Sequence, residues 1–471
     1  MAGKSIQIYS LQVATAAQEG GDQDANHLPD ISGRSFLGMA TTTATVDAFQ
    51  GDEAFHEEDQ GRRTPGENRP APIGVINGSG SSKYGAASGE FIRAMYPDEI
   101  SVSHRLRTPN GASPDSVPFG LVLNSSMGLF SPHAASMTVT VTGANKSQVI
   151  VDTATDGANI KVGQPIRLFT SDSTFYHEYA VVTAVSADGT PTAGNTTLTV
   201  HPELSEVAQA SDKIQLNYAF YPVVGDGDTT LKNDFHALFD MGGTGSAATV
   251  RRLASGCRCS GFEISNDNSG ASLSMSFRPM VMLQDDAAAS TSTTSEPAGK
   301  LLQHRYGCRV DLGGNHGGVA AGTAASTSRT YLANFDHSIS VSFDTSPGTP
   351  ETRGVMRGGS HEIHNATCSI SITSEYNETL QRMISRDELR TLIVGFGPGG
   401  SGDTNPNGAA FILKNASRAD GSANASGGDG NRIQQETALR ATADFNTYAG
   451  TPTGNDLNLA SAPFILCFPR S

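Results

Sequence analysis

Four segments of the chain alternate strictly between apolar residues and small hydroxyl residues. They are HSISVSFD (337–344), SLSMSF (272–277), CSISIT (368–373) and MTVTVT (137–142). Because successive side chains of a β-strand point to opposite faces, this alternation predicts strands with one apolar face and one Ser/Thr face. Such strands are typical of an antiparallel sheet that packs on one side and is open on the other. An open face made of uncharged hydroxyls, rather than of charged residues, needs an explanation.

A small β-domain is predicted over residues 137–222. Six short apolar segments follow one another there, separated by Gly, Asp and Asn turns: 137–142, 147–152, 164–170, 179–185, 196–202 and 213–220. This spacing favours a small barrel or sandwich. The pattern of the host chain resumes after residue 222, which indicates that the small domain is an insertion.

Few segments favour a helix. One-sided apolar spacing predicts a helix over 374–390, with Ser385 and Glu388 as a capping box that restarts it midway. The segment 88–100 predicts a short helix that ends before Pro97.

Strand and linker signals frame the rest of the chain. SIQIYSLQV (5–13) predicts a strand with a break near Tyr9. Residues 51–72 are polar, charged and interrupted by proline, which predicts a loop or arm. Residues 285–300 are low in complexity and lack large apolar residues, which predicts a linker between two β-rich blocks.

The composition agrees with a mainly β protein of two to four domains. The 471 residues are 37% hydrophobic and 17% charged, with 52 Gly, 22 Pro and no Trp, which favours strands and long turns. The formal net charge of −15 argues against general affinity for DNA. The odd number of cysteines, five, argues against a disulfide framework and favours synthesis in a reducing cytoplasm. We expect no signal peptide and no membrane anchor, because the apolar runs are too short.

Three motifs suggest chemistry, and their contexts argue against it. GFGPGG (395–400) follows a strand, but Pro398 removes a donor and no helix follows to bind a pyrophosphate. HEIH (361–364) places its histidines three residues apart, whereas a zinc-protease helix needs them four apart, and the segment runs directly into a strand. Cys257 and Cys259 are expected to be buried thiols. We therefore predict no catalytic, cofactor-binding or metal-binding residue, no cofactor, and no enzymatic activity.

The order of elements resembles a known family. The segments SGCRCSGFEISNDNSGASLSMSFRPMV (255–281), YGCRVD (306–311), CSISITSEYNETLQRMISRDELRTLIVGFG (368–397) and AAFILKNA (409–416) resemble the tail tube protein of long-tailed bacteriophages. In that family a β-sandwich with a flanking helix pairs its sheet with neighbouring subunits, forming a continuous β-barrel around a channel. The resemblance is one of pattern and covers about half of the chain.

The resemblance implies a layout of two fused tube modules. The first would comprise residues 1–136 and 223–284, the second residues 301–471, with the small β-domain at 137–222 and the linker at 285–300. Two modules per chain imply homotrimeric rings that stack into a tube. The implied partners are the tape measure protein, the tail terminator and baseplate proteins, while genome DNA passes through without specific binding. The protein would then be part of the virion, made in the cytoplasm of the bacterial host.

Other interpretations remain open at this stage. The Ser/Thr face could line a conduit, be buried in a polar contact between subunits, or merely reflect a Ser/Thr-rich composition. The chain could instead be a baseplate or decoration protein, a β-rich surface adhesin, which would need an export signal, or a carbohydrate-active enzyme, which the absence of Trp disfavours. For a conduit we expect a net acidic channel, because cations would retain DNA phosphates.

Overall fold

A computed structural model describes most of the chain after residue 98. The described residues are 8–16, 31, 33–39, 99–109, 113–169, 175–186, 194–223, 229–231, 234–241, 250–267, 270–279, 281–285, 293–295, 302, 309–315, 328–332, 336–347, 361–381, 389–397, 408–419, 424–427, 433–441 and 455–470. They form a mainly β protein, which confirms the predicted fold class at that level. Among the strands that the structure describes, all pairs are antiparallel except that of β15 with β2.

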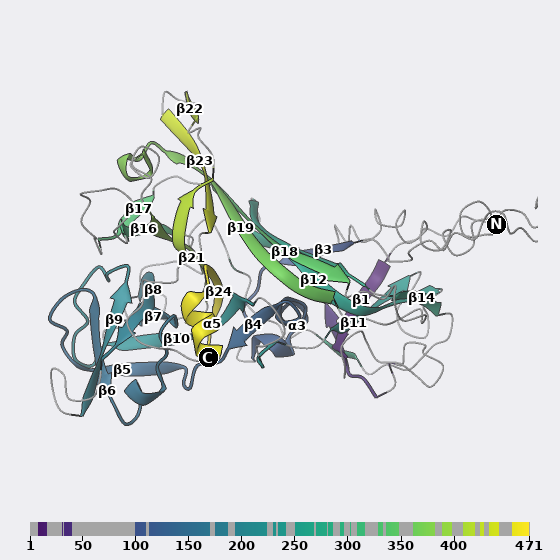
Figure 1. Cartoon of the computed structure of the whole chain (residues 1–471), viewed down its shortest axis with the longest axis horizontal. Helices are drawn as coiled ribbons and strands as arrows, with labels where there is room; N and C mark the ends of the chain where they lie inside the picture. The colour runs from purple at the N-terminus through teal and green to yellow at the C-terminus, as the bar shows by residue number, and fades with distance from the viewer. Residues whose placement is uncertain are drawn as a thin grey trace, which may run out of the picture.

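The strands with hydroxyl faces form one sheet, here called the serine sheet. Its strands, in spatial order, are β3 (Ile100–Arg105), β13 (Gly270–Arg278), the C-terminal half of β12 (Val250–Asp267), β18 (Asp336–Pro347), β19 (His361–Glu375) and β23 (Ile433–Ala441). The short β22 (Asn424–Gly427) pairs with β23. In Figure 1 these long strands run from the centre of the molecule toward the end that carries β14.

A second sheet, here called the inner sheet, packs against the apolar face of the serine sheet. Its order is β17 (Thr330–Leu332), β16 (Arg309–Asn315), β20 (Arg390–Phe396), β21 (Ala409–Arg418), β24 (Phe464–Pro469), the C-terminal half of β10 (Lys213–Pro222) and β4 (Met127–Phe130). The two sheets are joined where the end of β21 pairs with β23.

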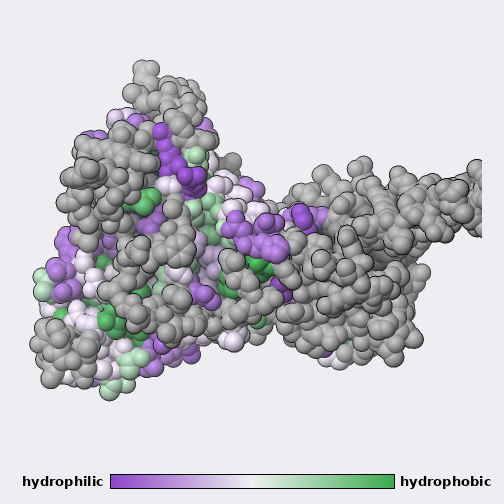
Figure 2. Space-filling model, in the orientation of Figure 1, coloured by the Kyte–Doolittle hydropathy of each residue, from purple (hydrophilic) through white to green (hydrophobic). Residues whose placement is uncertain are grey.

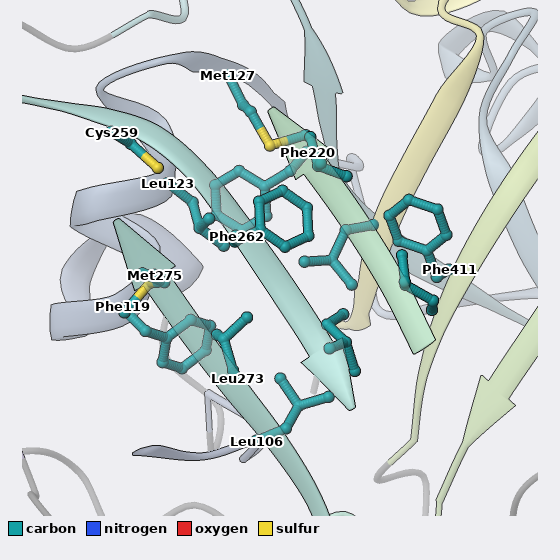
Figure 3. Close-up of a cluster of buried hydrophobic side chains, with 14 of the residues drawn as sticks. Leu106, Phe119, Leu123, Met127, Phe220, Cys259, Phe262, Leu273, Met275 and Phe411 are labelled. Carbon is teal, nitrogen blue, oxygen red and sulfur yellow. The ribbon is translucent and has the colours of Figure 1, made fainter. Parts of the chain in front are cut away.

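The main core lies between these two sheets. Phe262 of β12 and Phe411 of β21 meet across it with ring centroids 6.3 Å apart, and Phe411 stacks on Phe464 of β24. Helix α3 (Pro118–Asn124) covers one side of this core, where Phe119 contacts Phe468. Figure 3 shows Phe119, Phe262 and Phe411 with other buried side chains of this core, which converge from several elements. Residues assigned by sequence to two separate modules therefore share a single apolar core.

The inner sheet is buried on both faces. Every residue of β20 and β24 is buried, which explains why these strands show a continuous apolar run and no alternation. Their second face packs against helix α5 (Asn455–Ser461) and against Tyr179 and Val181 of strand β8. The inner sheet thus separates the serine sheet from the structure formed by the predicted insertion.

The predicted insertion forms a closed six-stranded barrel with an apolar core of its own. Around the barrel lie β5 (Ser136–Val141), β6 (Gln148–Asp152), β9 (Asn195–His201), β8 (Phe175–Val185), β7 (Pro165–Phe169) and the N-terminal half of β10, which pairs back to β5. The second half of β10, from residue 217 on, pairs with β24 and β4 instead. The end of the barrel is therefore inside β10, ahead of the expected boundary at residue 222.

A third sheet, here called the small sheet, extends from the end of the serine sheet that lies away from the barrel (Figure 1). Its strands are β15 (Thr293–Ser295), β2 (Phe36–Met39), β1 (Ile8–Thr15), β11 (Phe235–Met241), the N-terminal half of β12 and β14 (Val281–Asp285). The break expected near Tyr9 is a shift of register between Ile8 and Ser10. Part of the expected linker, 293–295, is a strand rather than free chain, because its backbone pairs with β2.

The expected helix at 374–390 is wrong at both of its ends. Strand β19 continues to Glu375, where it still pairs with β23, and Arg390 already belongs to β20. Residues 378–381 are helical, and residues 382–388, including Ser385 and Glu388, lie outside the described residues. Pairing across the sheet has overridden the apolar spacing that suggests helix. The arm at 51–72 and the expected helix at 88–100, up to residue 98, also lie outside the described residues.

Strand β12 changes sheets at a bulge that α3 holds in place. The register against β13 shifts between Cys259 and Gly261. The Cys259 amide donates to Ser125 Oγ at 3.0 Å, and Ser126 Oγ donates to the Cys259 carbonyl at 2.6 Å. These two serines follow the last turn of α3 and are buried. They satisfy backbone groups that a regular ladder would otherwise pair.

We expect Ser126→Ala to lower the free energy of unfolding by about 1–3 kcal/mol, because it leaves the buried Cys259 carbonyl without its donor. Urea unfolding followed by circular dichroism measures the change. Ser116→Ala is the control, since its hydroxyl bonds to the Ser113 carbonyl at an exposed position. Equal effects of the two changes would contradict a special role for the bulge.

Candidate assembly surface

The serine sheet carries a continuous hydroxyl face. The register places three successive rows across the strands, mostly of Ser and Thr but including Gly261, Glu263 and Arg105. Listed from β3 outward they are Ser101, Ser276, Gly261, Ser342, Thr367; Ser103, Ser274, Glu263, Ser340, Ser369; and Arg105, Ser272, Ser265, Ser338, Ser371. The residues between them on each strand, such as Met275, Ile264 and Val341, are buried in the main core. The two-faced sheet predicted from the alternation is confirmed for these strands.

The fourth alternating segment, 137–142, belongs elsewhere. It forms β5 of the barrel, where Thr138 and Thr140 are exposed and Met137 and Val139 are buried. The same pattern thus produces two-faced strands in two different sheets. One strand of the hydroxyl face, β3, was not predicted from the sequence. Its segment ISVSHR (100–105) alternates apolar residues with serine over only four residues.

The two halves of the hydroxyl face differ in their hydrogen bonding. Near β3 the hydroxyls bond to one another across the strands: Ser101 to Ser276 at 2.9 Å, Ser103 to Ser274 at 2.6 Å and Ser265 to Ser272 at 2.8 Å. Near β19 the hydroxyls of Ser340, Ser342, Thr367 and Ser369 are on exposed residues. Pairing between hydroxyls across the strands therefore stabilises the part of this face near β3, whereas near β19 the Thr367 hydroxyl donates to the Ser342 carbonyl at 3.5 Å.

The charges on this face are few, and most are acidic. Glu263 stands in the middle of the serines and accepts a hydrogen bond from Ser338 Oγ at 2.9 Å. The register puts four further carboxylates on the same side of β18, β19 and β23, namely Asp336, Asp344, Glu375 and Glu436. The arginines on this side are Arg105, Arg440 and Arg278, and Arg278 pairs with Glu99 at 3.4 Å. Among the described residues the face is therefore net acidic.

Hydrophobic residues are scarce on the exposed surface. Of the described large hydrophobic residues, Tyr331 and Tyr376 are the ones exposed. Among the residues that are coloured in Figure 2, most are hydrophilic or intermediate, and the hydrophobic ones lie in separate spots. An interface formed by the described part of this surface would therefore be mainly polar.

The motifs that suggest chemistry fall on strands. HEIH (361–364) begins β19, with Ile363 buried and His364 exposed, so it has no helix on which to form a zinc-protease site. Within GFGPGG, Gly395 and Phe396 end β20, and residues 398–400 lie outside the described residues. No group of three or more His, Cys, Asp or Glu side chains suited to a metal occurs among the described residues.

The cysteines with described positions are buried thiols. Cys257 and Cys259 point into the main core, as expected from the sequence, and Cys368 and Cys467 are buried as well. Burial raises the pKa of the Cys259 and Cys467 thiols to about 12 and raises the pKa of the other two. A thiol that keeps its proton is a poor nucleophile, so these residues are not suited to catalysis.

This burial predicts a loss of stability at alkaline pH. In the unfolded chain the thiols ionise near their ordinary pKa of 9.0, whereas Cys259 and Cys467 in the folded protein keep their protons up to about pH 12. The contribution of these protonated thiols to the free energy of unfolding is fully present below pH 9. It is lost as the pH rises from 9 toward 12, because the unfolded state then binds fewer protons than the folded state. Urea midpoints between pH 7 and 11 measure this. A Cys259→Ala, Cys467→Ala double variant should show a shallower decline.

Comparison with known proteins does not assign a family. No protein-family model matches the chain, and a search of curated proteins found no match. Within the described residues no helix has the length and apolar character needed to span a membrane. The function therefore has to be argued from the fold and from the hydroxyl face.

Proposed function

We propose that this chain is a structural virion protein that stacks in rings to form a phage tail tube, with the hydroxyl face toward the channel. The observation that carries the proposal is the open face of the serine sheet, where Ser and Thr fill most positions of three successive rows and the charged residues are mainly acidic. A sheet that only needed solubility would carry Lys and Glu on its open face. Small hydroxyls suit a surface past which a molecule has to move.

The chemistry of this face suits a conduit for DNA. Each contact between a phosphate and a cation adds affinity and slows passage. The hydroxyl face sets carboxylates such as Glu263 among serines, so a passing phosphate meets mainly neutral or negative groups. Of the arginines on this side, Arg278 is paired with Glu99. Serine side chains are also short, and they leave most of the channel width free.

The position of the barrel supports the same orientation. The barrel packs on the inner sheet through Tyr179 and Val181, on the side away from the serine sheet. If the hydroxyl face lines a channel, the barrel lies on the outside of the tube, where it obstructs nothing. Its removal from the chain has to spare residues 217–222, because they are part of the inner sheet.

The width of the channel provides a quantitative test. Six strands about 4.8 Å apart cover roughly 29 Å of circumference, so three chains give a channel roughly 27 Å across between backbones, before strand tilt widens it. Electron microscopy of the purified protein should show rings or tubes of that inner width, and the mass of a ring should equal three chains. Six chains per ring would contradict the two-module layout. Small fixed complexes without stacking would instead favour a baseplate or decoration protein.

We expect assembly to shield Ser340 but not Thr140. Both are exposed, Ser340 on the hydroxyl face and Thr140 on the barrel, and each can be replaced singly by cysteine. In unassembled chains the Ser340→Cys and Thr140→Cys variants should both react with a small maleimide and with a bulky polymer maleimide. In tubes the bulky reagent should fail at position 340 and still react at position 140.

The wild-type protein, labelled in parallel, reports the background from native thiols, including Cys308, which lies outside the described residues. Full reaction of the bulky reagent at position 340 in intact tubes would refute a channel-facing serine sheet, even if tubes form.

A further inference from the structure

One arginine connects the barrel with the body of the molecule. Arg329 immediately precedes β17, and its side chain is 3% exposed. Its Nη1 donates to Asp311 Oδ2 of β16 at 2.6 Å. Its Nε donates to the Glu203 carbonyl at 3.0 Å, and its Nη2 donates to the Tyr179 carbonyl at 2.8 Å. The guanidinium thus holds an inner-sheet carboxylate and two separate segments of the barrel at once.

A second contact from the same short strand strengthens this link. Tyr331, two residues after Arg329, donates its hydroxyl proton to Glu178 Oε1 of β8 at 2.8 Å. The other oxygen of Glu178 accepts the Ser205 amide at 2.7 Å. Because residues two apart in a strand point to the same side, Arg329 and Tyr331 reach the barrel together. Leu332 pairs with Val310 of β16, which anchors β17 to the inner sheet.

The surfaces on the two sides of this link approach very closely. A Cβ atom on Gly313 of β16 would lie 2.7 Å from the Pro202 side chain, and one on Gly408 would lie 2.7 Å from the Tyr179 hydroxyl. Gly163, in a barrel turn at φ +90°, would meet the backbone of α5 at Leu459 at 2.7 Å. Contacts this close at three points fit one relative orientation only.

We propose that residues 329–331 are a latch that holds the barrel in a single orientation on the inner sheet. Two adjacent segments join the barrel to the inner sheet, namely β10 and residues 131–135 between β4 and β5. Because both lie along one edge, they alone would let the barrel pivot. The latch removes that freedom because one buried, planar guanidinium has to satisfy three oxygen atoms on both sides. The barrel is then a rigid part of the particle and not a tethered appendage. This inference holds for the single chain and does not depend on tube formation.

The test measures the distance between barrel and body in unassembled protein. Spin labels on a Thr140→Cys, Ser340→Cys double variant report the distribution of that distance. The wild-type protein, treated with the same label, gives the background from native thiols. We expect one narrow distribution with Arg329 present. Arg329→Met removes the guanidinium, and Arg329→Lys keeps the charge but cannot reach both sides. In both variants the distribution of distances between the two labels should broaden, while the circular dichroism spectrum stays that of a folded β protein.

The matched control is Arg278→Met, which removes an arginine from a half-exposed ion pair with Glu99 on the serine sheet; it should leave the distribution narrow. A narrow distribution in the folded Arg329 variants, or a broad one in the unchanged chain, would overturn the latch. If both arginine variants fail to fold, Tyr331→Phe decides the question: a broader distribution supports the latch and an unchanged one rejects it.

Discussion

Phe411→Ala is expected to lower the free energy of unfolding by about 3–5 kcal/mol, the range for truncating a large buried aromatic residue. Phe411 is completely buried in the centre of the inner sheet. It stacks on Phe464 with ring centroids 5.8 Å apart and meets Phe262 of the serine sheet edge-on. The neighbours belong to backbones paired on both sides, so they cannot move in to fill the cavity.

The measurement is the urea midpoint followed by circular dichroism, since the chain has no Trp for fluorescence. Tyr376→Ala is the control, because Tyr376 is 55% exposed and its loss should change stability by at most about 0.5 kcal/mol. Phe411→Leu should recover much of the loss by keeping the site filled. A loss below about 1 kcal/mol for Phe411→Ala would show that the two sheets do not pack on a common core.

Asp234→Ala is expected to lower the free energy of unfolding by about 3–5 kcal/mol, because it leaves the buried charge of Arg258 without its partner. Arg258 Nε lies 2.8 Å from Asp234 Oδ1, and the two side chains are 1% and 0% exposed. The pair lies beside the bulge of β12, where that strand passes from the small sheet to the serine sheet. Without the carboxylate, folding buries the guanidinium of Arg258 away from water without the attraction of Asp234 to offset the loss of hydration.

The double variant Asp234→Leu, Arg258→Met separates the loss of the pair from the loss of packing. Its free energy of unfolding should be close to that of the wild type, and in any case well above that of Asp234→Ala. The reason is that apolar residues of similar size avoid the cost of removing charges from water. Arg278→Ala breaks an ion pair whose side chains are 46% and 38% exposed and should cost at most about 1 kcal/mol. If Asp234→Ala were as mild as Arg278→Ala, the pair would not be buried in solution.

The amino-acid sequence by itself determined the local character of the strands. Alternation of Ile339, Val341 and Phe343 with serines is a local property, because the two faces of a strand follow from backbone geometry alone. The spacing of short apolar segments between turn residues likewise predicted the barrel strands. A continuous apolar run such as that of the fully buried β24 has no period that distinguishes strand from helix.

Only the tertiary structure decided which strands are neighbours and where the units meet. The pairing of β12 with β18 brings together residues far apart in the chain, and no local pattern encodes that choice. The expected helix at 374–390 gave way at its start because β19 gains backbone partners on β23. Arg329 and Asp311 carry no signal in the sequence, because their roles arise from burial at the contact between barrel and inner sheet. Side-chain alternation depends on a single strand, whereas pairing and burial depend on the whole chain.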